Sequence, residues 1–185
     1  MSKKNGSGKV FALDSCVIRR IAGNQNYLTA LNCRMSLTGA RILISETAEF
    51  ELAKHGFNTG KIIDKLSSDL DAEFSLVPLS YEANVLAMDL IKKYSTLLHW
   101  PDNLHMAFAM VNDATLLSCD KDLALCCETE GWTCINPDII ATSCDARFGR
   151  KFRKSKWQRI VDRELPVAAT LRKPITKIRW EAFTI

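Results

Sequence analysis

Four acidic residues stand at or near the ends of separate predicted elements of the chain: Asp14, Glu51, Asp102 and Asp120. Asp14 and Asp120 each follow an apolar run that is typical of a buried strand. Ionised carboxylates are costly to remove from water, and they repel one another when they gather. Hard divalent cations such as Mg²⁺ or Mn²⁺ relieve both costs because they prefer oxygen ligands. The pattern therefore predicts a metal-dependent site.

The elements that must position these acids alternate along the chain. Apolar runs predict five strands, at residues 9–13, 41–45, 74–78, 115–119 and 132–136. Helical spacing predicts seven helices, at residues 15–21, 27–37, 46–55, 61–70, 80–91, 102–111 and 123–129. Strands separated by helices predict an α/β fold with a mostly parallel sheet covered on both faces. Sites in such folds lie outside the carboxyl ends of the strands, which is where Asp14 and Asp120 stand.

Each acid also has a structural alternative. Asp14, Asp102 and Asp120 are placed to cap the helices that follow them, and for Asp102 capping is compatible with metal binding. Glu51 lies in a helix that carries two other glutamates, and a surface helix often has such charges. We predict that Glu51 is the one that faces the site.

The ordered motifs resemble those of the PIN-domain nucleases. They are DSCV at Asp14, Ile44–Ser45 followed by Glu51–Leu52, D-x-L-H-x-A-x-A from Asp102, and LLSCDKDL around Asp120. The resemblance covers roughly residues 9–140. It implies a three-layer α/β/α sandwich that gathers three or four acids around one or two Mg²⁺ or Mn²⁺ ions. It also implies cleavage of RNA and, as in many members, the role of a toxin with an antitoxin partner.

The resemblance carries over four residues as catalytic acids and metal ligands: Asp14, Glu51, Asp102 and Asp120. Asp14 would be the shared ligand if two ions are bound, and Glu51 would bind a metal or orient the attacking water. Such an ion makes hydroxide accessible near neutral pH and offsets charge on the phosphoryl oxygens.

Three residues near the acids are predicted to support them: Ser118, Asp122 and His105. Ser118 would hold a ligand water or orient the neighbouring Asp120. His105 lies one turn after Asp102 and is expected to be a satisfied core or rim histidine, with contact to substrate phosphate or support of Asp102 as the alternatives. Trp100 is expected to pack against the protein, with base stacking as the alternative.

Charge is divided unevenly along the chain. Residues 1–140 have 13 Lys and Arg against 17 Asp and Glu, whereas residues 141–185 have 12 against 4. We predict a flexible leader at residues 1–8, a PIN-like domain at residues 9–140 and a basic C-terminal extension at residues 141–185. Basic residues interleaved with aromatic ones suit nucleic-acid binding, with a solvated tail or a packed amphipathic helix as the alternatives. The candidates are Arg150, Lys151, Arg153, Lys154, Lys156 and Trp157.

The cysteines and the apolar runs limit the class of protein. Seven cysteines are scattered without a C-x-x-C pair, which favours reduced cytoplasmic thiols over a zinc site. Cys16, Cys119 and Cys134 are expected to pack as small apolar residues. No apolar run approaches the roughly 18 residues that span a bilayer, so no membrane partner is predicted.

The predicted function is that of a cytoplasmic, metal-dependent endoribonuclease that hydrolyses phosphodiester bonds in RNA. A toxin role, an antitoxin partner and a homodimer are expectations from the resemblance alone. A structure-specific DNA nuclease is one alternative, because the acids do not choose the polymer. A phosphatase-like enzyme is another, and a catalytically inactive module that binds RNA or protein is the third.

Overall fold

The computed structural model describes residues 9–141 of the chain. The chain divides into two units after Ala141, and the described residues belong to the first. The predicted leader at residues 1–8 and the basic extension, with its six candidate nucleic-acid-binding residues, lie outside the described residues. Those assignments stay predictions.

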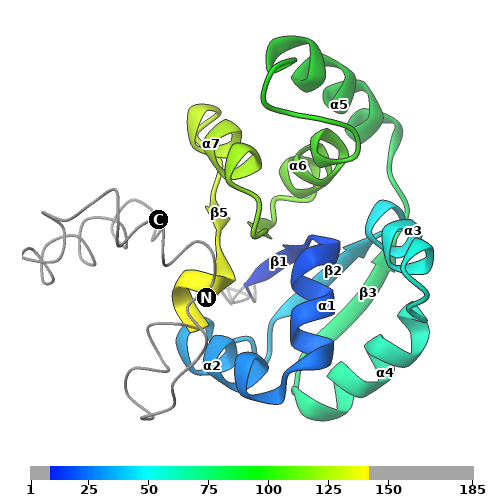
Figure 1. The fold of residues 1–185 in the computed structure, drawn as a ribbon, viewed down its shortest axis with the longest axis vertical. Helices are drawn as coiled ribbons and strands as arrows, with labels where there is room; N and C mark the ends of the chain where they lie inside the picture. Colours follow the sequence, from blue (N-terminus) through cyan, green and yellow to red (C-terminus); the bar gives the residue numbers. More distant parts are fainter. Residues whose placement is uncertain (1–8, 142–185) are drawn as a thin grey trace, which may run out of the picture. The chain divides into compact units, whose positions relative to one another are not determined.

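A sheet of five parallel strands organises the described residues, in the order β3-β2-β1-β4-β5 (Figure 1). The strands are β1 Val10–Leu13, β2 Arg41–Ser45, β3 Glu73–Val77, β4 Thr115–Leu117 and β5 Cys134–Ile135. Side chains of β1 and β2 point to both faces of the sheet and are buried on both, as at Phe11, Leu13, Ile42 and Leu43. Continuous apolar runs rather than alternating ones are what a sheet covered on both faces requires.

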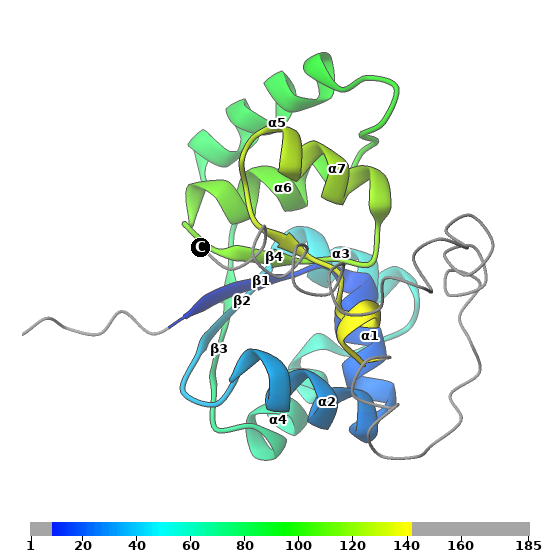
Figure 2. The ribbon, with the colours of Figure 1, turned by 90° about the vertical axis from the view of Figure 1, so that its left-hand side faces the viewer.

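Helices cover both faces of this sheet. They are α1 Ser15–Gly23, α2 Gln25–Met35, α3 Glu46–Lys54, α4 Thr59–Asp69, α5 Tyr81–Lys93, α6 Asp102–Val111 and α7 Lys121–Thr129. In both ribbon views α1, α2 and α4 lie on one side of the sheet, and α5, α6 and α7 lie on the other (Figures 1 and 2). The predicted three-layer α/β/α fold is therefore confirmed. Within residues 9–141, every helix is too short or too polar to cross a membrane.

Local hydrogen bonds explain where the element boundaries differ from the predicted ones. The Asn24 side chain accepts from the backbone N–H of Tyr27, so α2 begins earlier than predicted. The same helix ends before Ser36, whose backbone is left-handed with φ of 54°. Asn58 caps α4 in the same way through the N–H of Lys61. Strand–strand pairing sets the lengths of β4 and β5, which are shorter than the apolar runs that contain them.

The strand order places a topological switch point between β1 and β4. From β1 the chain builds the sheet in one direction through β2 and β3, and it then returns to add β4 on the other side of β1. Ligands in open α/β sheets bind outside the carboxyl ends of the strands at this point. Asp14 directly follows β1, and its N–H donates to the carbonyl oxygen of Leu117 at the end of β4 (3.0 Å).

Candidate active site

All four predicted acids line one cavity of about 270 Å³ at the carboxyl ends of β1 and β4. Each acid comes from a different part of the chain: the end of β1, the middle of α3, the start of α6 and the loop after β4. The other residues that line the cavity are Ser15, Cys16, Arg19 and Cys119. The structure therefore brings together side chains that are far apart in the chain, from Asp14 to Asp120.

Asp14 is the most enclosed of the acids and is held by several donors. Its carboxylate accepts from the Ser118 hydroxyl (2.6 Å), from the Cys16 thiol (3.1 Å) and from the Cys16 backbone N–H (3.2 Å), so that it also caps α1. Burial alone would raise the pKa of Asp14, but the nearby His105 and these hydrogen bonds lower it below its usual value. Asp14 is thus a carboxylate with a fixed position and a stable negative charge.

A histidine links two of the acids. His105 on α6 is fully buried, and its Nε2 lies 2.7 Å from Glu51 Oε2 and 3.8 Å from Asp14 Oδ1. Burial alone would lower the pKa of His105, but the hydrogen bond with Glu51 and the charge of Asp14 raise it above its usual value. The expectation that His105 holds Asp102 is wrong, because the imidazole reaches across to α3 instead.

Asp102 and Asp120 differ in how their carboxylates are used. Pro101 is the N-cap of α6 and makes no side-chain capping bond, and Asp102 is the first helical residue, so the capping alternative for Asp102 is wrong. Burial, together with the charges of Asp120 and Asp14, raises the pKa of Asp102 to about 6. Asp120 does cap α7, accepting from the N–H of Leu123 at 2.8 Å. Capping uses one of its two carboxylate oxygens and leaves the other for a ligand.

Comparison with known families decides where this fold belongs. The family model of the PIN domain matches residues 12–127. The chain belongs to the PIN-domain family. No curated protein matches the chain.

Solved structures with the same fold are distant in sequence. A toxin–antitoxin complex from Klebsiella pneumoniae aligns with a TM-score of 0.50 and 16% identity, over 69% of this chain and 97% of that one. VapBC2 from Rickettsia felis, bound to a DNA fragment from its promoter, aligns with a TM-score of 0.51 and 15% identity, over 69% and 98%. These likenesses agree with the three-layer fold of this PIN domain.

The donor set of the PIN domain fits a divalent cation. Asp14, Glu51 and His105 each offer a ligand atom, and these atoms lie within 4.8 Å of one another. Asp102 and Asp120 line the same cavity, and burial together with repulsion from Asp120 and Asp14 raises the pKa of Asp102. A bound cation would relieve that repulsion, and a set dominated by carboxylate oxygens suits Mg²⁺ or Mn²⁺.

Two of the predicted supporting residues lie elsewhere than expected. The Ser118 hydroxyl donates to Asp14 and accepts from the backbone N–H of Asp120 at 3.0 Å, so the carboxylate that it orients is Asp14. Asp122 is exposed in the first turn of α7 and does not line the cavity. Its position follows from the cap, because α7 begins at once after Asp120 and turns Asp122 toward solvent.

Replacing Ser118 with Ala is expected to weaken Mn²⁺ binding about 10- to 100-fold, as is usual when the partner of a metal ligand is removed. The free energy of unfolding should also fall by about 1–3 kcal/mol, because the buried Asp14 carboxylate loses a donor and the N–H of Asp120 loses its acceptor. Calorimetric Mn²⁺ titration and urea denaturation measure the two effects. The exposed Ser67→Ala on α4 is the control. Unchanged Mn²⁺ affinity in Ser118→Ala would show that Asp14 needs no such support.

Four residues of the cavity lining were not predicted from the sequence: Ser15, Cys16, Arg19 and Cys119. Cys16 was expected to pack as an apolar residue and is instead half-buried in the cavity, where it donates to Asp14. Arg19, also on α1, lines the same cavity. Ser15, Cys16 and Arg19 share one face of α1, and that helical spacing after Asp14 is the signal that could have found them.

Arg19 brings a positive charge among the carboxylates. Its Nε is buried and has no hydrogen-bond partner within the described part of the chain, and no ion pair joins it to an acid of residues 9–141. Buried guanidinium donors are normally paired. Arg19 therefore places a guanidinium with an unpaired Nε in the lining of the cavity.

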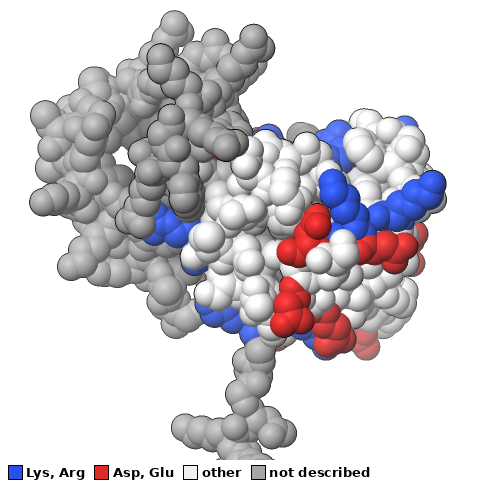
Figure 3. Space-filling model, turned by 90° about the horizontal axis from the view of Figure 1, so that it is seen from below, with Lys and Arg blue, Asp and Glu red and all other residues white. Residues whose placement is uncertain are grey.

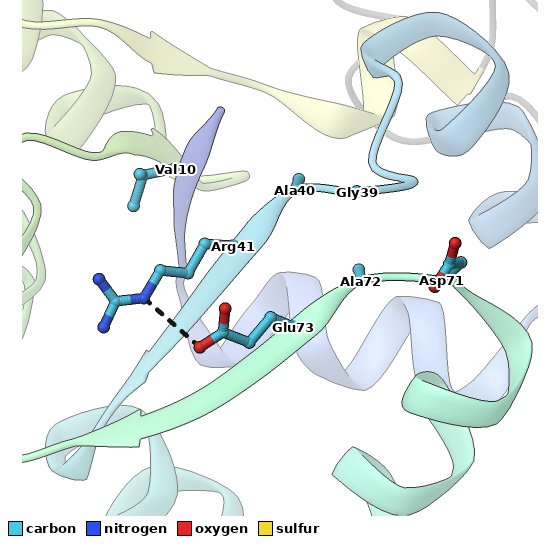
Figure 4. A pocket seen from close by; sticks show the side chains of 7 residues that line it. All are labelled: Val10, Gly39, Ala40, Arg41, Asp71, Ala72 and Glu73. Atoms are coloured by element: carbon cyan, nitrogen blue, oxygen red, sulfur yellow. Dashed lines mark ion pairs between the residues drawn. The ribbon is translucent and has the colours of Figure 1, made fainter. Parts of the chain in front are cut away.

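A larger cavity of about 450 Å³ lies at the opposite ends of the strands. Figure 4 shows that its lining comes from the amino ends of β1, β2 and β3, with small side chains such as Ala40 and Ala72. Arg41 and Glu73 form an ion pair at 3.9 Å in this cavity, and both side chains are exposed to solvent. Exposed pairs of this kind contribute little, and the acids of the PIN-domain site are absent from this lining.

Proposed function

We propose that this PIN domain is a metal-dependent endonuclease that hydrolyses phosphodiester bonds in RNA. The observation that carries the proposal is the convergence of four carboxylates from four separate elements on one cavity at the switch point of the sheet. Membership of a nuclease family whose members use divalent metal ions supports it further.

We assign the metal-holding role to Asp14, Glu51, Asp102 and Asp120, with Mg²⁺ or Mn²⁺ as the ion. When bound, the ion supplies activation of water and neutralisation of charge on the phosphoryl group. Ser118 and Cys16 hold the Asp14 carboxylate in place through their hydrogen bonds. His105 fixes the orientation of Glu51, which is then positioned to orient the attacking water.

The polymer is tested with RNA and DNA strands of the same sequence, labelled at one end. Wild-type protein is expected to cut the RNA internally in Mn²⁺ or Mg²⁺ and to leave it intact in EDTA. Faster cutting of the DNA would reassign the substrate to DNA. Retained binding without cleavage of either strand in either metal would instead favour the inactive binding module.

An antitoxin partner belongs to the same proposal. It is supported by the two similar structures, which are described as a toxin–antitoxin complex and as VapBC2 with promoter DNA. The expected phenotype is growth arrest on expression of the wild-type chain, relieved when hydrolysis is lost. Normal growth at high expression of active protein would contradict the toxin role, and the nuclease assignment would still hold.

We assign Arg19 to the substrate phosphate, because a guanidinium matches two phosphate oxygens and Arg19 has an unused buried donor. Arg19→Gln is expected to raise the KM for RNA about tenfold or more, the scale of a lost charged hydrogen bond. Its affinity for Mn²⁺ should change little. Steady-state kinetics and Mn²⁺ titration separate the two.

Arg20→Gln is the matched control for Arg19→Gln. Arg20 is the next residue of α1, but it bonds to Asp138 and does not line the cavity. Its KM should match that of the wild type. A KM in Arg19→Gln that also matches the wild type would contradict the phosphate-binding role.

A further inference from the structure

We propose that Phe50, Lys54 and Trp100 form a platform on which a single-stranded nucleic-acid segment stacks beside the acid cavity. We call these three residues the aromatic platform. The proposal deepens the proposed function, on which it rests, by giving the substrate a binding surface outside the residues that act on the phosphate.

The platform comes from α3, which carries Glu51, and from the turn just before α6, which carries Asp102. Phe50 directly precedes Glu51 on α3, and Trp100 lies two residues before Asp102, the first residue of α6. The contact between His105 and Glu51 joins α6 to α3. The aromatic platform therefore lies close to the cavity, because Phe50 and Trp100 are within two residues of Glu51 and Asp102 in its lining.

A lysine lies over both rings. Lys54 Nζ is 4.5 Å from the centroid of the Phe50 ring and 5.8 Å from the Trp100 ring, within the range of a cation–π contact. Phe50 and Lys54 are one turn apart on α3, so they share a face of that helix. The amine thus contacts two aromatic side chains, one from α3 and one from the turn before α6.

Both rings remain largely open to solvent. Trp100 is 58% exposed and Phe50 is 52% exposed, so the expectation that Trp100 packs against the protein is wrong. Single exposed apolar residues need no explanation, but two large exposed rings that contact one lysine form a defined surface. Ring faces in this arrangement can each receive a base, at about 1–3 kcal/mol per stacked base.

The single charge of the platform, on Lys54, suits a nucleic-acid occupant, whereas the described residues as a whole are acidic. Lys54 makes no ion pair with an acid among residues 9–141, so its amine is free to meet a phosphate. Those residues hold 11 Lys and Arg against 17 Asp and Glu. On the face seen in Figure 3, acidic side chains gather in several groups beside basic ones, without a broad basic surface among the described residues. A polyanion must therefore be held here by local contacts, which stacking and one cation supply.

The occupant must be single-stranded. Bases within a duplex are stacked on one another, and only unpaired bases can turn a face to an aromatic side chain. This requirement connects the aromatic platform to an internal cut in unpaired RNA.

The test measures binding in EDTA, where hydrolysis does not interfere. Two fluorescein-labelled RNA strands of about ten nucleotides are compared, one with all its bases and one abasic at every position that could stack. Trp100→Ala and Phe50→Ala are expected to weaken binding of the normal strand about tenfold each and to leave the abasic strand unchanged. Trp100→Phe, which keeps a ring, should retain most of the affinity.

Two further variants separate stacking from charge. Lys54→Gln should weaken both strands by a similar factor and lower the salt dependence of binding, because its contact is with the backbone. Tyr81→Ala is the control, since Tyr81 is an 80% exposed aromatic residue on α5 outside the platform. It should leave every dissociation constant as in the wild type.

Each other outcome overturns the platform. If Trp100→Ala and Phe50→Ala bind the normal RNA strand as tightly as the wild type, the platform does not bind nucleic acid. A surface that binds a protein segment would give the same result. Equal losses on the normal and abasic strands would remove stacking, and absence of binding by the wild type would remove the site. Cleavage in Mn²⁺ is measured in parallel, so a nuclease without the platform and a platform without nuclease activity are told apart.

Discussion

Replacing Asp14 with Asn should lower metal-dependent RNA hydrolysis by at least about a thousandfold, the scale seen when one member of a catalytic unit is removed. Asp14 is the innermost carboxylate of the cavity, and the Ser118 and Cys16 hydrogen bonds hold it there as an anion. Asn has nearly the same shape and also caps helices well, so α1 should keep its cap. The loss is therefore of charge and not of fold.

Single-turnover cleavage measures the hydrolysis, and circular dichroism with thermal denaturation checks the fold. Asp64→Asn is the matched control, because Asp64 is exposed on α4 and does not line the cavity. Wild type and Asp64→Asn should cut RNA alike and, if the toxin role holds, should arrest growth alike. Equal cleavage by Asp14→Asn and the wild type would point to a contaminating nuclease and would remove the proposed active site.

The positions of the strands and of the acids could be predicted because both depend on local sequence. A buried parallel strand must be apolar on both faces, and RILIS and VFAL show this directly. The carboxyl end of such a strand is also where a site lies in this class of fold, so Asp14 and Asp120 could be placed before the topology was known. Helix ends were less accurate, because a single cap such as Asn24 moves them.

Pairings across the cavity could not be predicted, because they depend on how distant elements pack. The partner of His105 is 54 residues away on α3, and the partner of Ser118 is 104 residues away after β1. Sequence proximity suggested Asp102 as the partner of His105 and Asp120 as the partner of Ser118. In the structure the partners are Glu51 and Asp14. The exposure of Trp100 has the same cause, since only the packing of α3 against α6 leaves its ring beside Lys54.

Replacing Asp102 with Asn should stabilise the metal-free protein while removing its activity. The pKa of Asp102 is raised to about 6 from the usual 3.8, so the folded state binds this proton more tightly than the unfolded chain does. Folding stability must then fall as pH rises through the window between these two values, and above it the cost is fully present. After a discount for solvent screening, the Asn variant should be about 1–2 kcal/mol more stable near neutral pH, or several degrees in Tm.

Two comparisons test whether the free-energy cost of ionised Asp102 arises because Asp102 belongs to a cation-binding site. In EDTA the advantage of Asp102→Asn in Tm should disappear well below pH 4, where the wild-type carboxyl is protonated and neutral. In excess Mn²⁺ the order should reverse, because the wild type gains the free energy of binding the ion and the variant gains less. A residue that only maintained the fold would lower Tm when replaced, under both conditions. A metal-binding role requires that the Asp102 carboxylate lowers stability without the ion and raises it with the ion. A higher Tm of Asp102→Asn that persists in Mn²⁺ would contradict that role.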